Sequence, residues 1–307
     1  MRLLLLGFAL LVGAATSVGQ RERVVAITID DLPAVSADTA DWPAVTERIL
    51  KTLDAYRAPA VGFVNERKLY VADTLDPARV ALLAAWLRAG QELGNHTFAH
   101  RGAHDTPLAE YLDGITQGEV VTRELARRAG RPFRYFRHPQ LHTGRSLAYR
   151  DSVVRFLAAH GYTVAPVTVD NQEWVYARAY LLAKQRGDSA LTARVVRAYL
   201  QHLDTAFTYS EGLSRTVFGR DIPLVLLLHA NELNADHLGD VLARLRARGY
   251  RFASLPAVLA DSAYRSPETY VGPSGMSWLI RWAETRGIRI PNEPREEAWV
   301  SDLASGR

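Results

Sequence analysis

Short apolar runs alternate with longer amphipathic stretches along most of this chain. Seven segments of four to seven residues predict strands: residues 24–29, 60–64, 92–95, 133–136, 163–169, 223–229 and 251–254. The segment at 92–95 has a weak pattern and is predicted mainly from its place in the alternation. Five longer stretches with apolar residues at helical spacing predict helices: residues 43–56, 77–90, 108–129, 147–160 and 236–248. Strands that alternate with helices pair in parallel and are buried on both faces. The pattern therefore predicts an α/β fold, either a closed barrel or an open doubly wound sheet.

Two segments depart from this alternation. Residues 174–218 form a connection that is longer than the others and mostly helical in pattern, which predicts an insertion at the rim of the sheet. The last forty-odd residues contain Trp278, Trp282 and several prolines. We expect residues 261–307 to form a C-terminal extension that packs on the main domain, residues 21–260.

The first twenty residues have the pattern of a secretory signal. Met1 and Arg2 precede an apolar run at residues 3–12, and small residues follow at 13–19. This run is shorter than the roughly 20 apolar residues that span a bilayer. We therefore predict a cleaved signal peptide at residues 1–20 and an exported protein, periplasmic or secreted. An uncleaved membrane anchor is the alternative, and no later segment is a candidate for a membrane span.

Composition narrows the possible chemistry. The chain has 307 residues, of which 48% are hydrophobic and 23% charged, as in an ordinary globular protein. Its net charge of +4 is spread out, without the Lys/Arg block that tracks phosphates, so we do not expect nucleic acid as a partner. The chain contains no cysteine, which excludes disulfides, thiolate metal sites and cysteine nucleophiles. Nothing in the sequence predicts the oligomeric state.

Ionisable residues follow five of the seven predicted strands. They are Asp30 and Asp31 after the first strand, His96 and His100 after the third, Arg137 after the fourth, Asp170 after the fifth and His229 after the sixth. Because the carboxyl ends of parallel strands meet at one edge, we expect these side chains to lie together. Taken singly, the aspartates are also typical of turns and helix caps, and His229 of a buried core histidine. One Asp and two His form a common catalytic metal-ligand set, so Asp31, His96 and His100 are the predicted ligands.

The same residues resemble the motifs of a known family, the polysaccharide deacetylases of the NodB-homology type, or carbohydrate esterase family 4. The resemblance covers residues 24–255 and keeps the motifs in the family's order. The five matching segments are Thr28 to Pro33, His96 to His100, Arg137 to Pro139, Asp170 to Trp174 and Leu227 to His229. It implies a distorted (β/α)7 barrel, here with the helical rim insertion and the C-terminal extension.

The resemblance also implies a role for each residue. Asp30 would be the catalytic base, oriented by Arg137, and His229 the catalytic acid. Asp170 would keep the ion-pair network in register, and the backbone N–H of Gln140 would help to hold the oxyanion. Two further residues are expected to contact substrate: Trp174 and Leu227. The expected cofactor is a divalent metal, first Zn²⁺, with Co²⁺, Ni²⁺ or Mn²⁺ as alternatives.

The expected substrate is an acetylated carbohydrate polymer, either an N-acetylglucosamine-type glycan or an acetylated hemicellulose. Three departures from the family pattern fall around the site. Leu32 replaces a glycine and is expected to make the floor of the site bulkier, Gly144 comes late in the third motif, and Glu173 replaces an aspartate. They leave open a hydrolase of small N-acyl or cyclic amides on the same fold, and a non-catalytic glycan-binding protein.

Overall fold

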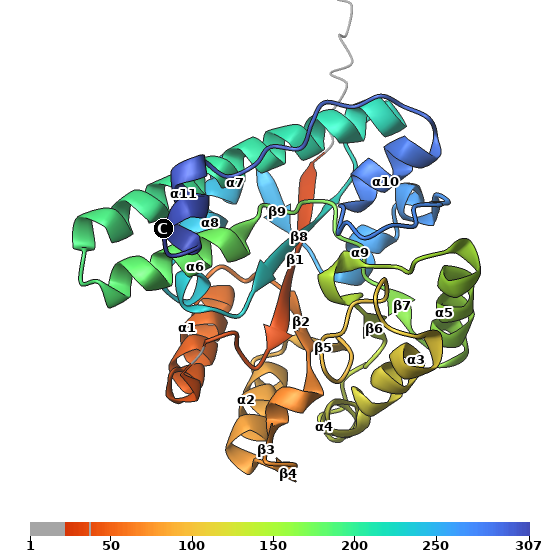
Figure 1. Cartoon of the computed structure of the whole chain (residues 1–307), viewed down its shortest axis with the longest axis horizontal. Helices are drawn as coiled ribbons and strands as arrows, with labels where there is room; N and C mark the ends of the chain where they lie inside the picture. Colours follow the sequence, from red (N-terminus) through yellow and green to blue (C-terminus); the bar gives the residue numbers. More distant parts are fainter. Residues whose placement is uncertain (1–21, 37) are drawn as a thin grey trace, which may run out of the picture.

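Seven parallel strands form one curled sheet in the computed structural model, which describes residues 22–36 and 38–307 (Figure 1). The predicted signal peptide at residues 1–20 lies outside the described residues. The strands run in the order β7-β6-β5-β2-β1-β8, and β9 also pairs with β1. Their bounds are β1 Arg23–Leu32, β2 Ala60–Val64, β5 Glu92–Asn95, β6 Tyr135–Phe136, β7 Thr163–Val164, β8 Leu224–His229 and β9 Tyr250–Phe252.

The chain that follows β7 closes the curled sheet against β8. Val169 pairs with Leu226 in an isolated parallel bridge. The N–H of Thr168 donates to the carbonyl of Val225, and the N–H of Leu227 donates to that of Val169, each over 3.1 Å. These bonds join the two edges of the sheet, and the predicted distorted (β/α)7 barrel is confirmed.

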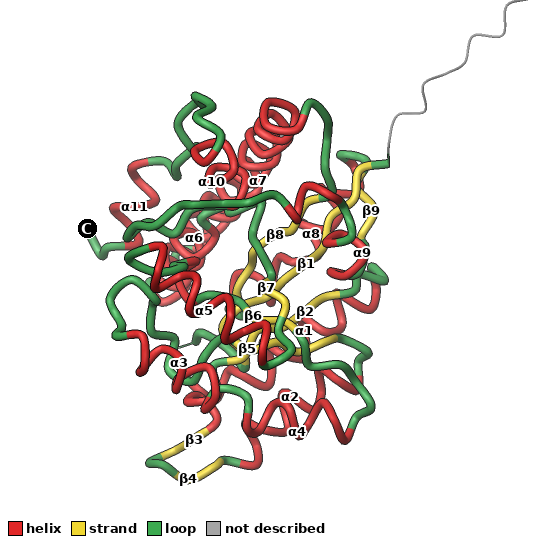
Figure 2. Tube along the Cα trace, turned by 90° about the vertical axis from the view of Figure 1, so that its right-hand side faces the viewer, coloured by secondary structure: helices red, strands yellow, loops and turns green. Residues whose placement is uncertain are grey.

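Helices cover the outside of the barrel (Figure 2). Those that connect or follow its strands are α1 Trp42–Ala55, α2 Pro77–Arg88, α3 Leu108–Gln117, α4 Val120–Arg128, α5 Leu147–Ala159, α8 Glu232–Ala247 and α9 Leu255–Leu259. The long connection between β7 and β8 contains α6 Glu173–Gln185 and α7 Ser189–Phe218, which confirms its predicted helical character. No helix in the described part of the chain is both long enough and apolar enough to cross a membrane.

The predicted helix at 108–129 is wrong in one respect, because it is two helices. α3 ends at Gln117 and α4 begins at Val120. A Cβ atom at Gly118 would lie 2.6 Å from the backbone nitrogen of Phe98, so this glycine lets the break sit against the loop that carries His96 and His100. The N–H of Phe98 donates to the carbonyl of Gly114 over 2.8 Å. The break between α3 and α4 thus leaves room for the loop after β5, and the end of α3 is hydrogen-bonded to that loop.

Two predicted strands are at least two residues longer than the observed ones. The prediction of 163–169 holds for β7 only at Thr163–Val164, and Pro166 has no N–H to continue the ladder. The prediction of 133–136 shortens to β6. A short hairpin of β3 Tyr70–Val71 and β4 Thr74–Leu75 was not predicted.

The C-terminal segment shares the main core. It contains α10 Trp278–Thr285 and α11 Ala298–Ala304. Eight of its apolar side chains belong to the same buried cluster as the strand residues: Ala263, Trp278, Leu279, Ile280, Trp282, Ala283, Val300 and Leu303. The N–H of Trp278 also donates to the carbonyl of Val167 over 2.7 Å. The segment is therefore tied directly to the chain that closes the barrel.

Candidate active site

Three side chains at the carboxyl edge of the sheet form a group that fits a metal ion. Asp31 lies near the end of β1, and His96 and His100 lie in the loop after β5. One ligand atom from each lies within 4.8 Å of the others. Oδ1 of Asp31 is 3.8 Å from Nε2 of His96 and 3.5 Å from Nε2 of His100. Ligands of a tetrahedral zinc with bonds of about 2.0–2.1 Å stand about 3.3 Å apart, close to these spacings.

The surrounding hydrogen bonds support this assignment. Nδ1 of His96 donates to the carbonyl of Arg137 over 2.8 Å, which leaves Nε2 of the neutral ring free to bind a metal. Asp31 and His100 have left-handed backbone conformations, with φ of 70° and 56°. Oδ1 of Asp31 is buried and has no hydrogen-bond partner among the described residues. An unpartnered buried carboxylate oxygen beside two imidazoles is a donor set that suits Zn²⁺ and similar divalent cations.

The ligands also have suitable protonation states. Burial lowers the pKa of both His96 and His100, so their rings are neutral at neutral pH. Burial would raise the pKa of Asp31, but the positive charge of Lys68, together with the nearby histidines, holds it below the usual range. Lys68 donates from Nζ to the backbone carbonyl of Asp31 over 2.8 Å, and its Nζ is 3.8 Å from Oδ1.

Asp30, next to the metal group, has the environment of a general base. Burial raises its pKa to about 6, and the charge of Arg137 opposes the rise. Nη1 of Arg137 lies 3.4 Å from Oδ2 of Asp30, and Nη2 donates to Oγ1 of Thr28 over 2.9 Å. Arg137 is fully buried and lies over the ring of Phe63. Asp30 is thus mostly ionised at neutral pH and still basic enough to accept a proton.

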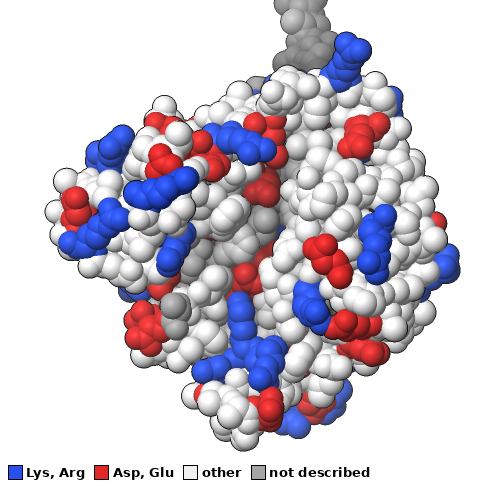
Figure 3. Space-filling model, in the orientation of Figure 1, with Lys and Arg blue, Asp and Glu red and all other residues white. Residues whose placement is uncertain are grey.

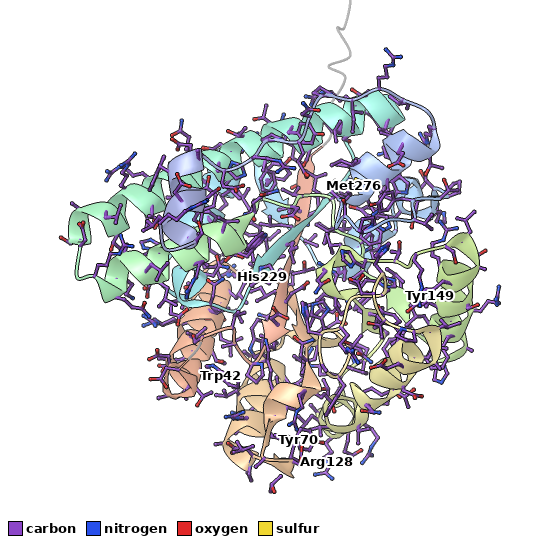
Figure 4. All side chains as sticks on the ribbon, viewed as in Figure 1. Trp42, Tyr70, Arg128, Tyr149, His229 and Met276 are labelled. Atoms are coloured by element: carbon purple, nitrogen blue, oxygen red, sulfur yellow. The ribbon has the colours of Figure 1, made fainter. Side chains whose placement is uncertain are left out.

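His229, at the end of β8, has the environment of a general acid (Figure 4). Its Nδ1 donates to Oε2 of Glu173 over 2.9 Å, and its backbone N–H reaches the same oxygen over 3.1 Å. Burial would lower the pKa of His229, but the hydrogen bond and charge of Glu173 raise it to about 9. Glu173 is buried and accepts a further bond from Asn231. The imidazole is therefore protonated at neutral pH.

Asp30 and His229 are neighbours on two adjacent strands. Asp30 on β1 is the register partner of His229 on β8. Asp31 follows Asp30 directly, so the group of Asp31, His96 and His100 lies beside this pair. A metal site flanked by a base and a protonated acid can hydrolyse an amide or an ester.

Residues 17–165 match a family described as polysaccharide deacetylase. This part of the chain is a domain of the polysaccharide deacetylase family. The resemblance drawn from the motifs is thereby confirmed. No protein with a curated description matches the sequence.

Several solved structures have the same fold as this chain, although their sequence identity to it is low. A polysaccharide deacetylase from Bacillus cereus has 17% identity and a TM-score of 0.54, over 83% of this chain and 100% of that one. The peptidoglycan deacetylase PdaC from Bacillus subtilis has 19% identity and a TM-score of 0.51, over 80% and 94%. A CE4 family pseudoenzyme from Bacillus anthracis has 18% identity and a TM-score of 0.52, over 78% and 66%. The fold thus occurs both in deacetylases and in a protein described as a pseudoenzyme.

Most of the predicted site residues line one pocket: Asp30, His96, His100, Gln140, Asp170, Trp174, Leu227 and His229. Three further residues complete its lining: Leu141, His142 and Gly275. Arg137 lies fully buried beneath it. A second pocket contains Asp31 and shares Trp174 and His229 with the first. Trp174 is 61% exposed where the two pockets meet. Figure 3 shows this face of the molecule hollowed near its centre, with acidic side chains inside the hollow.

One contact of His229 was not predicted, and one expectation, at Leu32, differs from the structure. The direct partner of His229 is Glu173, whereas Oδ1 of Asp170 accepts from the N–H of Gln172 over 3.0 Å. Burial raises the pKa of Asp170, which lies close enough to His229 and Arg137 for their charges to oppose that rise. The expectation that Leu32 makes the floor of the site bulkier is wrong. Leu32 is fully buried and packs where Gly62 has no side chain, because a Cβ at Gly62 would lie 2.2 Å from its Cδ1. The glycine at position 62 in β2 is the feature of the sequence that could have indicated where Leu32 packs.

Proposed function

We propose that this protein is a metal-dependent deacetylase that removes acetyl groups from a carbohydrate polymer. One observation carries the proposal: a base with a pKa of about 6 and an acid with a pKa of about 9 stand in register on adjacent strands, beside a metal-ligand group. The pH range between the two values includes neutrality, where both groups are in the forms that the reaction uses.

The residues divide the work as follows. A divalent cation held by Asp31, His96 and His100 would lower the pKa of a bound water and polarise the acetyl carbonyl. Asp30 accepts the proton of the attacking water, and Arg137 keeps its carboxylate oriented and ionised. His229 donates a proton from Nε2 to the departing amine or alkoxide, while Nδ1 stays bonded to Glu173. Zinc is the first choice for two imidazoles and one carboxylate.

The surface around the site supports a polymeric substrate over a small amide. Two pockets meet at the metal group, and the exposed indole of Trp174 lies between them. An aromatic face of this kind suits the apolar face of a sugar ring. A chain of sugars lying across both pockets would bring one acetyl group to the site while its neighbours contact Trp174.

Export is part of the proposal, on the strength of the signal-like first twenty residues. An acetylated glycan outside the cytoplasm would then be the natural substrate class. N-terminal sequencing of the protein recovered from periplasm and medium tests this part, and retention of residues 1–20 would contradict cleavage.

The function is tested by metal analysis and acetate release. The purified protein is expected to bind about one zinc per chain and to release acetate from chito-oligosaccharides or acetylxylan, with loss of activity after chelation and recovery with added zinc. A panel of small N-acyl and cyclic amides is assayed in parallel. Turnover of the small amides alone would reject the polymer as substrate and favour a small-amide hydrolase. Glycan binding without acetate release under any metal would favour a non-catalytic glycan-binding protein.

A further inference from the structure

The C-terminal segment reaches the loop that carries Gln140. This loop, Pro139 to Thr143, follows β6 and contains two consecutive left-handed residues, Gln140 with φ of 55° and Leu141 with φ of 54°. Non-glycine residues in this conformation cost about 1–2 kcal/mol each and persist where neighbouring structure holds them. Something outside the loop must therefore stabilise it.

Arg281 on α10 supplies that support. Its Nη1 donates to Oγ1 of Thr143 over 3.0 Å, and its Nη2 donates to the backbone carbonyl of Leu141. Nε donates to the carbonyl of Met276 over 2.9 Å (Figure 4 labels Met276). All three nitrogens of the guanidinium are thus used, two of them on the loop. Such a planar fork fixes direction as well as distance, which a lysine ammonium does not.

The guanidinium is held rigidly in its own pocket. Arg281 is fully buried, between the rings of Tyr270 and Trp278 at 5.1 and 4.3 Å from their centroids. Burial lowers its pKa to about 10, so it stays charged at neutral pH. Oε1 of Glu268 lies 3.9 Å from Nη1. Because these contacts fix the guanidinium in place, its hydrogen bonds also fix the loop relative to α10.

The same segment also contacts the loop through its backbone. A Cβ atom at Gly275 would lie 2.2 Å from the carbonyl oxygen of Gln140, so no larger residue fits between them. Gly275 and Gln140 both line the pocket that contains Asp30 and His229. Close backbone contact on one side and the guanidinium on the other hold the turn at Gln140 between them.

We propose that Arg281 is a positioning residue, which holds the Gln140 turn in the conformation that presents its backbone N–H to the substrate. This rests on the proposed deacetylase function for its effect on turnover. The segment that contains Arg281 is then part of the catalytic unit, although the site residues themselves come from the barrel.

The test compares Arg281→Lys with Gly275→Ala and with Arg286→Lys as the matched control. Arg286 follows the same helix and donates to Val217 and Ser266, away from the loop. Arg281→Lys keeps the charge but loses the fork, and Gly275→Ala displaces the same turn without touching the arginine. Both are expected to lower kcat about 10- to 100-fold with KM within about twofold, since misplacement by about 1 Å costs about 10²-fold.

Two readouts separate positioning from general destabilisation. Zinc affinity is expected to stay within about twofold of wild type in all three variants, because the ligands lie on other loops. Amide hydrogen exchange in residues 137–145 is expected to be at least about tenfold faster in Arg281→Lys and Gly275→Ala, and unchanged in Arg286→Lys. Wild-type kcat and exchange in Arg281→Lys would overturn the proposal, as would equal losses in Arg286→Lys or loss of zinc affinity.

The proposed function can fail separately. If the wild-type protein releases no acetate, the deacetylase proposal falls, and the exchange comparison still decides whether Arg281 holds the loop.

Discussion

Replacing Glu173 by glutamine is expected to move the alkaline limb of the pH–rate profile. Glu173 bonds to both the ring and the backbone N–H of His229, and its charge raises the pKa of that ring to about 9. Glutamine keeps the shape and can still accept from Nδ1, but it removes the negative charge. Burial then acts on His229 against only the charges of Asp31 and Asp30, so its pKa falls toward the ordinary value of 6.5.

The size of the effect follows from these two values. A fall from about 9 to about 6.5 corresponds to about 3 kcal/mol between the protonation states. For the full fall, the protonated fraction of His229 at pH 8 drops from about 0.9 to about 0.03, so titration alone lowers kcat by up to about 30-fold. At pH 6 most of the ring remains protonated in both proteins, and the loss is expected to be less than about fivefold.

The assay is acetate release from an acetylated oligosaccharide between pH 5 and 10, for wild type, Glu173→Gln and Glu232→Gln. Glu232 is a half-buried carboxylate in the neighbouring pocket, three residues from His229, and its replacement controls for loss of a nearby charge. A cation in the site acts on His229 in all three proteins, so the difference between profiles isolates Glu173. An alkaline limb in Glu173→Gln that coincides with wild type would refute the role of Glu173 and the identification of His229 as the acid.

Three further predictions follow from the site and its supports. Asp30→Asn is expected to keep zinc content near wild type and to lose about 10²–10⁴-fold in kcat; retained acetate release would count against Asp30 as the base. Gly118→Ala would place a Cβ 2.6 Å from the backbone of Phe98, so we expect about 1–3 kcal/mol loss of stability in urea unfolding and weaker zinc binding by calorimetry, and unchanged values would contradict the close contact. Trp174→Ala removes an exposed ring, so its melting temperature should stay within about 2 °C while KM rises for long oligosaccharides more than for short ones; equal KM values at all lengths would argue against a sugar platform.

The sequence predicted the parts of the fold that local pattern controls. Strand β2 begins and ends where the apolar run at residues 60–64 does. The grouping of Asp31, His96 and His100 was also predictable, because carboxyl ends of parallel strands meet at one edge.

What the sequence did not predict depends on contacts between distant segments. Glu173 and His229 are 56 residues apart, and only the closed barrel brings the start of α6 against the end of β8. The break at Gly118 exists because the loop at Phe98 needs the space. The support that Arg281 gives to Leu141 spans 140 residues and has no local signature.

Because Asp30 and His229 are register partners on neighbouring strands, their relative position does not depend on the conformation of the surrounding loops. Neighbouring strands are about 4.8 Å apart, and this spacing is fixed by backbone hydrogen bonds rather than by loop conformation. Insertions in the loops can therefore change the pockets around the site while the register of Asp30 and His229 stays constant. Substrate preference can diverge in evolution without the reaction geometry having to be rebuilt.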